Sequence, residues 1–385
     1  MSLRKRIDSI LKGFEQEFDT HNRIEVSRSA LLHNLAIFRE ISGGEAIIPV
    51  LKGNAYGHGI EVVARALAGQ DVPYVAVDGY FEALRVREVS RQLVLIMGAI
   101  KPANFPRMKY DGFAFVVQDE AAIKALGSIG KKINVHLECN TGMNRYGAKL
   151  TEVPRLTQLI LAYHNLNLEG VMSHLADADG DDPTTVEAAE DLFDSCVEAV
   201  RKAGGQPTLF HVAQTAGSTR SRSGYSNAMR LGIGLYGLNP FAPKHPMHDR
   251  LGGLRPALKL VSTITKVTEL QAGEQVSYNY TFTALKPMRI GVLPLGYYEG
   301  LNRALSSVGV VKVGASYTPV AGRICMNHTM ISLEGIDAQV GDEVVVYSDD
   351  PNDRNSIDRI AAEQRLFNYS LLTGLSHDVR RILVP

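Results

Sequence analysis

Short apolar runs alternate with longer amphipathic stretches from about residue 24 to residue 240. Eight of the runs have the length of strands: IIPVLK from Ile47, YVAVD from Tyr74, LVLIMG from Leu93, FAFVV from Phe113, NVHLEC from Asn134, LEGVMSH from Leu168, TLFHVA from Thr208 and MRLGIGLYG from Met229. Helical patterns such as GIEVVARALAG and TTVEAAEDLFDSCVEAVRKAG lie between several of them. This order predicts a TIM-like (β/α)₈ barrel of parallel strands. A doubly wound open sheet would give a similar pattern, so periodicity alone leaves both open.

The pattern changes after about Pro246. The segments ALKLVSTITKVTEL, EQVSYNYTF, MRIGVLPL, VGVVKVG and DEVVVYS are β-rich, are separated by turn residues and show little helical periodicity. They predict a second, mostly antiparallel β domain. We therefore expect an N-terminal arm over residues 1–23 that packs with the β domain, a barrel over 24–245 and the β domain over 246–385.

Composition narrows the class of protein. Of 385 residues, 45% are hydrophobic and 21% charged, as in globular proteins, and 41 basic residues balance 41 acidic ones. This balance gives no support to binding of nucleic acid or of a membrane surface, and no apolar run approaches the roughly 20 residues of a membrane span. Cys139, Cys196 and Cys325 form no CxxC pair. Together with the absence of a signal-peptide pattern, this predicts a cytoplasmic protein.

Polar residues gather just past the ends of the predicted barrel strands, where TIM barrels build their active sites. Five strand ends contribute: Lys52 and Tyr56 after the first, Arg145 after the fifth, His174 after the sixth, Thr215 after the seventh, and Arg230, Gly232 and Ile233 at the eighth. Loops after strands seven and eight frequently hold phosphate. A lysine opposite such a seat suits a phosphorylated aldehyde cofactor bound as a Schiff base.

Simpler interpretations apply to each residue alone. A lone lysine after a strand is usually a solvated charge, a lone histidine usually makes a structural hydrogen bond, and Gly57 and Gly59 can simply permit a turn. The GxGxxG of residues 232–237 is followed by Asn-Pro where a Rossmann helix should begin. The acidic run from Asp177 lacks the glycine and glutamate of a calcium loop. His58 and His174 have no ligand-spaced partners that would make a metal site, so we expect none.

Longer motifs carry a resemblance. VLKGNAYGHG resembles the cofactor-lysine motif of bacterial alanine racemases, and TGMNRYG, SHLADAD, RLGIGLYGL, VSYNYTF, LPLGYYEG and GRICMNH resemble further blocks of that family in the same order. The resemblance runs from about Arg23 to the C-terminus. It implies pyridoxal phosphate as cofactor, a small amino-acid substrate, and a homodimer whose active sites are shared between subunits.

The resemblance also implies roles for individual residues. Lys52 looks like the Schiff-base lysine and one catalytic base, and Tyr278 like the second base, delivered by the partner subunit. Arg230 is implied to face the pyridine nitrogen, with His174 linking it to Tyr278. The remaining assignments are the phosphate seat of Tyr56, Thr215, Gly232 and Ile233; Arg145 on the cofactor's phenolic oxygen; the backbone of Met326 on the substrate carboxylate; and an entrance of Tyr297, Arg303 and Arg323.

Racemisation removes the α-proton on one face and returns a proton on the other, so two bases must flank a planar intermediate. Free lysine and tyrosine have pKa values of about 10.4 and 10, so the site must lower them through burial or cationic neighbours. Arg230 keeps its proton and should leave the pyridine nitrogen unprotonated. The predicted function is interconversion of L- and D-alanine by two bases acting on a pyridoxal phosphate aldimine.

Four positions depart from the family pattern. Thr215 stands where serine is usual, Asn327 where aspartate is frequent, and Glu138 aligns with a lysine that is carbamylated in some members. His377 in GLSHDVRR replaces a tyrosine that lines the substrate, which leaves serine or another amino acid open as substrate. Two rival functions are a decarboxylase of basic amino acids, which should show an acidic partner at the pyridine nitrogen, and a non-catalytic pyridoxal phosphate carrier, which should resemble the barrel alone.

Overall fold

The structure is a computed structural model that describes residues 19–385, and it divides into two compact units. The barrel unit contains residues 26–257 and 383–385. The β unit contains residues 258–382 and the described residues up to Glu25. Most of the predicted N-terminal arm, residues 1–18, lies outside the described residues, so that arm stays a prediction.

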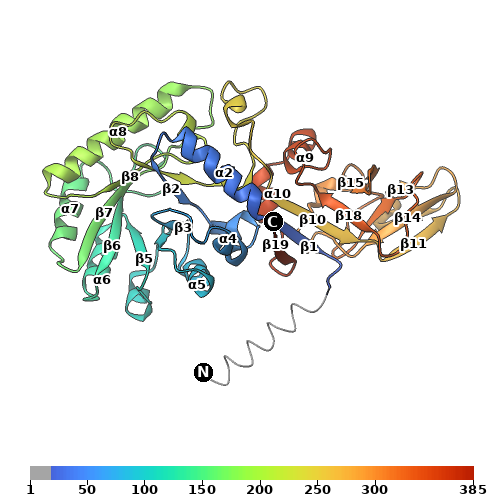
Figure 1. Ribbon diagram of the computed structural model, residues 1–385, viewed down its shortest axis with the longest axis horizontal. Coiled ribbons are helices and arrows are strands. Elements are labelled where there is room, and N and C mark those ends of the chain that lie inside the picture. Colours follow the sequence, from blue (N-terminus) through green and yellow to red (C-terminus); the bar gives the residue numbers. More distant parts are fainter. Residues whose placement is uncertain (1–18) are drawn as a thin grey trace, which may run out of the picture. The chain divides into compact units, whose positions relative to one another are not determined.

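Eight parallel strands form the barrel (Figure 1). They are β2 (Ala46–Pro49), β3 (Val75–Val77), β4 (Val94–Ile96), β5 (Phe113–Val117), β6 (Ile133–Glu138), β7 (Leu166–Met172), β8 (Leu209–His211) and β9 (Ala228–Leu231). Strands β3 to β8 pair in sequence order, and β2 pairs with β9. The ring closes because Leu51 N donates to Ala76 O at 2.7 Å and Arg230 N donates to Ala213 O at 3.0 Å. All eight predicted strands are present, and the barrel rather than the open sheet is confirmed.

Helices surround the strands on the outside of the barrel (Figure 1). They are α2 (Arg28–Ile41), α4 (Ile60–Ala66), α5 (Tyr80–Val89), α6 (Glu120–Gly127), α7 (Val153–Leu161) and α8 (Pro183–Lys202), with 3₁₀ turns η1 (Pro102–Arg107), η2 (Gly217–Thr219), η3 (Ile233–Tyr236) and η4 (His248–Leu251). Two residues of the acidic run before α8 accept hydrogen bonds from the first turn of that helix. Asp182 is its N-cap and accepts from Thr184 N, while Asp177 accepts from the Thr185 hydroxyl.

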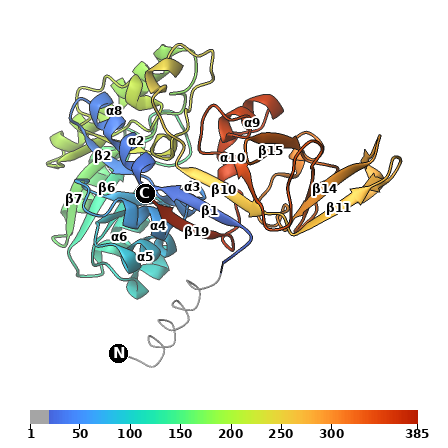
Figure 2. The same ribbon diagram turned by 45° about the vertical axis from the view of Figure 1, so that its right-hand side comes forward.

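The β unit contains three sheets (Figure 2). Six strands lie in the order β16-β15-β18-β10-β1-β19, three in the order β11-β14-β17, and β12 pairs with β13. Their bounds are β1 (Arg23–Ser27), β10 (Leu258–Thr263), β11 (Lys266–Leu270), β12 (Gln275–Val276), β13 (Phe282–Thr283), β14 (Met288–Leu293), β15 (Val310–Val313), β16 (Ser316–Pro319), β17 (Thr329–Ser332), β18 (Glu343–Tyr347) and β19 (Arg380–Val384). The pairings β10–β18, β15–β18, β11–β14 and β14–β17 are antiparallel, as predicted.

Helical structure in the β unit was underestimated from the sequence. It holds α9 (Ile357–Gln364) and α10 (Asn368–Thr373), besides the 3₁₀ turns η5 (Tyr278–Tyr280) and η6 (Arg303–Leu305). Ile357, Ile360 and Ala361 form the buried face of α9, which is a helical spacing but too short a run to stand out.

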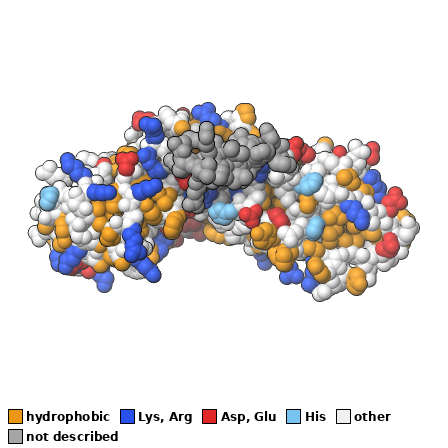
Figure 3. All heavy atoms as spheres, turned by 90° about the horizontal axis from the view of Figure 1, so that it is seen from below, with side chains coloured by type: hydrophobic (Ala, Val, Ile, Leu, Met, Phe, Trp, Pro, Cys, Tyr) orange, Lys and Arg blue, Asp and Glu red, His pale blue; other side chains and the backbone are white. Residues whose placement is uncertain are grey.

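Apolar, basic and acidic side chains are interspersed over the face in Figure 3. Within residues 19–385, no helix is both long and apolar enough to cross a bilayer.

Candidate active site

Lys52 begins a left-handed turn that follows strand β2. Gly53, Asn54, Ala55 and Tyr56 all have φ between 51° and 64°. Left-handed backbone costs residues other than glycine roughly 1–2 kcal/mol each, so surrounding contacts must enforce it. The predicted role of Gly57 and Gly59 in a turn agrees with their φ values of 84° and 94°.

Side chains from α4 and α5, together with Asn54 of the turn itself, enforce this backbone. Glu82 accepts hydrogen bonds from the amides of Gly53 at 2.7 Å and of Asp78 at 3.0 Å, so it joins the loops after β2 and β3. Asn54 Oδ1 accepts from Ile60 N at 3.1 Å and from Arg85, which is paired with Glu61. Hydrogen bonds from both neighbouring helices therefore fix the turn, and they hold the backbone next to Lys52 rigidly.

Cationic neighbours and burial act on the Lys52 amine. Burial lowers its pKa, and the charges of Arg145 and Arg230 lower it further. The carboxylate of Asp78 acts in the opposite direction without reversing the shift. A lysine with a lowered pKa is closer to the neutral form that a base or a nucleophile requires.

Arg230 lies at the C-terminal end of β9 and is 3% exposed. Its Nη1 donates to His211 Nδ1 and to His211 O, both at 2.7 Å, and its Nη2 donates to the carbonyl groups of Ser173 and Val212. Burial lowers its pKa to about 10, so the guanidinium remains charged near neutral pH. These four acceptors, together with His174, hold the guanidinium in one orientation.

His174 follows β7 and contacts Arg230. Arg230 Nη2 lies 3.2 Å from His174 Nδ1, which must accept this hydrogen bond because a guanidinium only donates. Burial lowers the pKa of His174 to about 3, and the charges of Arg230, Arg145 and Lys52 contribute. His174 is therefore neutral, and its Nε2 carries the proton.

Tyr56, Thr215 and Gly232 converge in a small polar space. Thr215 Oγ1 accepts hydrogen bonds from Gly232 N at 3.1 Å and Gly234 N at 3.3 Å. A methyl group added at Gly232 would lie 2.8 Å from the Tyr56 hydroxyl oxygen. Ile233 follows directly and begins η3. The predicted phosphate residues are thus brought together at one end of the barrel.

Arg145 lies in the exposed loop that follows β6. Asn140 Oδ1 shapes this loop by accepting from the amides of Gly142 at 3.0 Å and Asn144 at 3.1 Å. Glu138 is buried at the start of the loop; burial raises its pKa, although Arg230 and Arg145 both act to lower it. Glu138 is therefore a buried acid that interacts electrostatically with both Arg230 and Arg145.

Three loops of the β unit bring a second set of predicted residues together. Tyr297 N donates to Cys325 O at 3.0 Å, and the Ser277 hydroxyl donates to Arg323 O at 2.7 Å. Tyr278 and Met326 are 67% and 54% exposed, and Tyr297 is exposed too. Ser277 has a φ of 68°, which is strained for serine. This set presents its side chains to the outside of the β unit.

Two residues that depart from the family pattern, Asn327 and His377, lie in the β unit. Asn327 Nδ2 donates to Glu299 Oε1 at 2.8 Å, and Ser376 N donates to Glu299 O at 3.1 Å. His377 is exposed in the turn after Ser376, and Arg303 is exposed in η6.

Sequence reasoning missed His211 and Glu82. His211 is the last residue of β8, and the sequence pattern placed it in a strand without indicating a role. A polar histidine within an apolar barrel strand was the feature that could have revealed it. Glu82 lies in helix α5 among other charged and polar residues, and nothing in the local sequence distinguishes it. Within residues 19–385, no group of three or more His, Cys, Asp or Glu side chains is arranged to hold a metal ion.

The fold and the site define a class of protein: a two-unit barrel and β-domain enzyme whose lysine, arginine and histidine side chains meet at the strand ends. Family models narrow the class. Residues 26–240 match the alanine racemase N-terminal domain, and residues 257–383 match the alanine racemase C-terminal domain. The chain belongs to the alanine racemase family.

Individual relatives agree. The chain is 32% identical to "Alanine racemase 2" of Caldanaerobacter subterraneus over 94% of both chains, and 31% identical to an alanine racemase of Francisella philomiragia over 94% of this chain and 100% of the other. The crystal structure of alanine racemase from Streptomyces lavendulae has a TM-score of 0.87 at 25% identity, covering 96% of this chain and 98% of that one. The matches span both units, which argues against a barrel-only carrier.

Proposed function

We propose that this enzyme interconverts L- and D-alanine with pyridoxal phosphate as its cofactor. The observation that carries the proposal is Lys52, a lysine with a lowered pKa that the rigid left-handed turn holds among the strand-end cations. The relatives named above as alanine racemases support the substrate.

The side chains of the barrel unit fit the proposed cofactor. Adding a methyl group at Gly232 would fill the space beside the Tyr56 and Thr215 oxygens, so this glycine leaves room for a phosphate. Lys52 supplies the amine that an aldehyde requires, and the buried guanidinium of Arg230 supplies a permanent cation for the ring nitrogen. Tyr56, Thr215, Gly232 and Ile233 would hold the phosphate, and Arg145 the phenolic oxygen.

When bound, pyridoxal phosphate withdraws electrons from the attached amino acid and so acidifies its α-hydrogen. Lys52 Nζ takes or returns the proton on one face, and Tyr278 Oη does so on the other. Arg230 keeps its own proton, because its pKa remains near 10 despite burial. Neutral His174 stays hydrogen-bonded to Arg230 and orients it. An arginine at the ring nitrogen also distinguishes this proposal from a decarboxylase, for which an acidic partner is expected.

We further propose that the active form is a homodimer in the cytoplasm, in which Tyr278 of one subunit serves the barrel of the other. The exposed set of Tyr278, Tyr297 and Met326 supports this, since three neighbouring apolar side chains facing outward favour a partner surface. Met326 and Tyr297 would then border the substrate.

Serine is the second candidate substrate, and His377 favours it. An imidazole is smaller than the phenol it replaces and adds a polar nitrogen that can bond a hydroxyl. A chiral assay of the purified protein against alanine, serine and lysine decides the matter: alanine is expected to have the highest kcat/KM, and serine or lysine in first place would overturn the substrate assignment. His377→Tyr is expected to raise the preference for alanine over serine.

Borohydride reduction tests the cofactor site. The treatment fixes pyridoxal phosphate to the lysine that binds it, and peptide mass mapping is expected to find the pyridoxyl group on Lys52. Attachment to another lysine, or failure of the protein to retain the cofactor, would refute the proposal.

Tyr278→Phe tests the second base, because it removes the ionisable hydroxyl with little change in shape. Racemisation is expected to fall almost to zero, while solvent deuterium still exchanges into one enantiomer faster than into the other. Equal residual exchange from both enantiomers would contradict the assignment of Tyr278.

A further inference from the structure

A line of buried polar side chains crosses the barrel interior from Arg230 to the opposite end of the strands. Arg230 contacts His211 Nδ1 at 2.7 Å, and His211 Nε2 lies 2.8 Å from His136 Nδ1. His136 Nε2 lies 3.3 Å from Glu169 Oε2. The same carboxylate oxygen accepts from the Tyr74 hydroxyl. Both histidines are fully buried, so these contacts are not exchanged for water.

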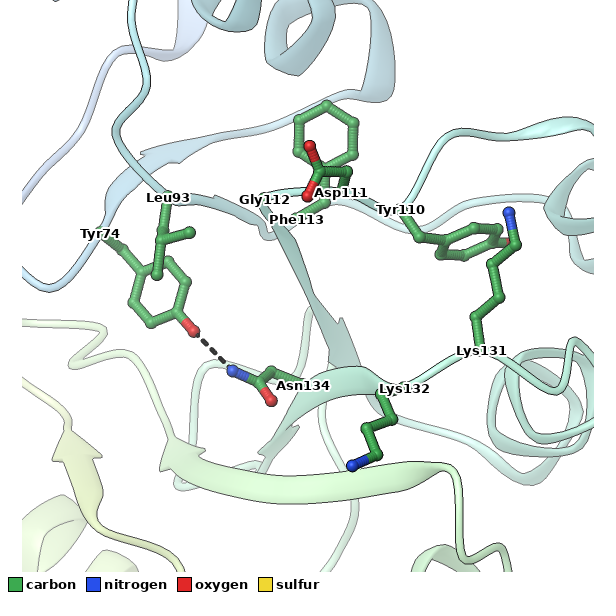
Figure 4. A pocket seen from close by; sticks show the side chains of 9 residues that line it. All are labelled: Tyr74, Leu93, Tyr110, Asp111, Gly112, Phe113, Lys131, Lys132 and Asn134. Atoms are coloured by element: carbon green, nitrogen blue, oxygen red, sulfur yellow. Dashed lines mark hydrogen bonds between the residues drawn. The ribbon is translucent and has the colours of Figure 1, made fainter.

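The far end of this line lies at the wall of a cavity. Tyr74 and Asn134 line a cavity of about 400 Å³ near the N-terminal ends of β3 to β6, and Figure 4 shows the hydrogen bond of 3.1 Å between them. Solvent reaches the Glu169 side chain, which is 22% exposed. Burial alone would raise the pKa of Glu169, but hydrogen bonds from His136 and Tyr74 hold it below its usual value. Glu169 is therefore an ionised acceptor.

The chemistry of the two end groups fixes the direction of every bond between them. A guanidinium has donors only, so His211 Nδ1 must be bare and its proton must lie on Nε2. His211 then donates to His136 Nδ1, which must also be bare, and the proton of His136 lies on Nε2 and points at Glu169. Burial and the charge of Arg230 lower the pKa of His211, so this ring is neutral.

We propose that Glu169 and His136 are positioning residues that fix both histidine tautomers and thereby hold the Arg230 guanidinium in its orientation. Without an acceptor at residue 169, a proton on His136 Nε2 would be buried without a hydrogen-bond partner, which favours moving it to Nδ1. The Nδ1–H tautomer of His136 would meet the Nε2–H of His211 donor to donor. His211 would then have to move its own proton to Nδ1, where it faces a donor of Arg230.

Any effect of these residues on pyridoxal phosphate binding rests on the proposed function of Arg230. The histidine tautomers can be measured independently of that function. ¹⁵N spectra of histidine-labelled holoenzyme distinguish a ring nitrogen that carries a proton from one that does not, and spectra of His136→Asn and His211→Asn proteins assign the signals. We expect both rings of the wild type to be neutral with the proton on Nε2. A proton on Nδ1 of either ring would overturn the proposal.

We call the chain Glu169–His136–His211–Arg230 the relay. Three variants distinguish an effect on the tautomers of this relay from a general loss of stability. Glu169→Leu removes the acceptor and is expected to shift both tautomers and to weaken pyridoxal phosphate binding at least about tenfold, the scale on which outer hydrogen-bond partners act. Glu169→Gln keeps an acceptor oxygen and should retain the wild-type tautomers. Tyr74→Phe is the matched control, because it also removes a hydrogen bond to the Glu169 carboxylate but leaves the acceptor for His136.

The outcomes can be told apart. Unchanged tautomers in Glu169→Leu, or altered tautomers in Tyr74→Phe, would refute the relay while racemisation by the wild type continues. Where Glu169→Leu does not fold, Glu169→Met takes its place, because it keeps the length of the side chain and also lacks an acceptor oxygen; unchanged tautomers in that variant would likewise refute the proposal. Correct tautomers in a protein that binds no pyridoxal phosphate would leave the relay standing and refute the proposed function.

Discussion

The Arg230 side chain is fixed in orientation by hydrogen bonds that do not neutralise its charge. Arg230 has acceptors on both Nη1 and Nη2, and each is a carbonyl or an imidazole rather than a carboxylate. The positive charge is therefore oriented without being neutralised in place. Glu138 is close enough to affect Arg230 electrostatically, but no hydrogen bond joins the two among the residues described. A cation arranged in this way remains available to a ligand.

Gly232→Ala should weaken binding of pyridoxal phosphate about tenfold, or by about 1.4 kcal/mol. Its methyl group would lie 2.8 Å from the Tyr56 hydroxyl oxygen, so the tyrosine must move out of the proposed phosphate seat. An absorbance titration measures the dissociation constant. Gly224→Ala is the matched control, because its nearest neighbour lies 3.4 Å away. In a Tyr56→Phe background the Gly232→Ala change should have a much smaller effect; an undiminished effect there would show that the Tyr56 hydroxyl is not the group displaced.

His174 should make the protein less stable in acid. Its folded pKa of about 3 lies below the unfolded value of about 6.5, so between these values the unfolded chain binds a proton that the folded chain does not. Stability therefore falls as the pH drops through this window, by at most about 1.4 kcal/mol per pH unit for one group. His174→Gln should reduce the loss of unfolding free energy between pH 7.5 and pH 5 by up to about 2 kcal/mol. Urea unfolding at fixed protein and cofactor concentrations measures it, and an equal loss in both proteins would refute the shift.

Among the elements, the left-handed turn after β2 does most to place the site. Ala55 is fully buried with a φ of 54°, whereas Ala64 is fully buried within the right-handed helix α4. Glycine at position 64 should cost about 1–2 kcal/mol through lost packing and helix propensity. Glycine at position 55 loses the same methyl group but relieves left-handed strain. Ala55→Gly should therefore destabilise by at least about 1 kcal/mol less than Ala64→Gly in denaturant unfolding. Equal losses would mean that the turn is unstrained.

The elements also show what the sequence could and could not reveal. Barrel strands are predictable because each is a short, mostly apolar run bounded by polar segments, and the position of Lys52 just after the first of them follows directly. The left-handed turn was not predictable, since Asn54, Ala55 and Tyr56 adopt it only under hydrogen bonds from α4 and α5. Strands β1 and β19 were missed because their partners are remote in sequence. The relay was missed for the same reason: His136, Glu169 and His211 look like ordinary strand residues until the barrel brings them together.

At the scale of the whole molecule, the two proposed bases belong to different compact units. Lys52 lies in the barrel unit, and Tyr278 lies on an exposed loop of the β unit. The proposed dimer unites them across subunits, so each site needs one residue from each chain. A monomer would then lack activity even with both units folded.

Subunit exchange tests this arrangement. Lys52→Ala and Tyr278→Phe proteins should each be inactive, and mixing them under conditions that exchange subunits should restore activity. In a mixed dimer, one site collects both defects, whereas the other combines an intact Lys52 with an intact Tyr278. In an equal mixture that exchanges at random, about half of the dimers are mixed, and each mixed dimer has one working site out of two. Activity per total protein should therefore approach about a quarter of the wild-type value. Mixing Lys52→Ala with wild type serves as the control, because it should show no gain beyond the wild-type contribution. Verified mixed dimers without activity would place both bases in one chain and refute the shared site.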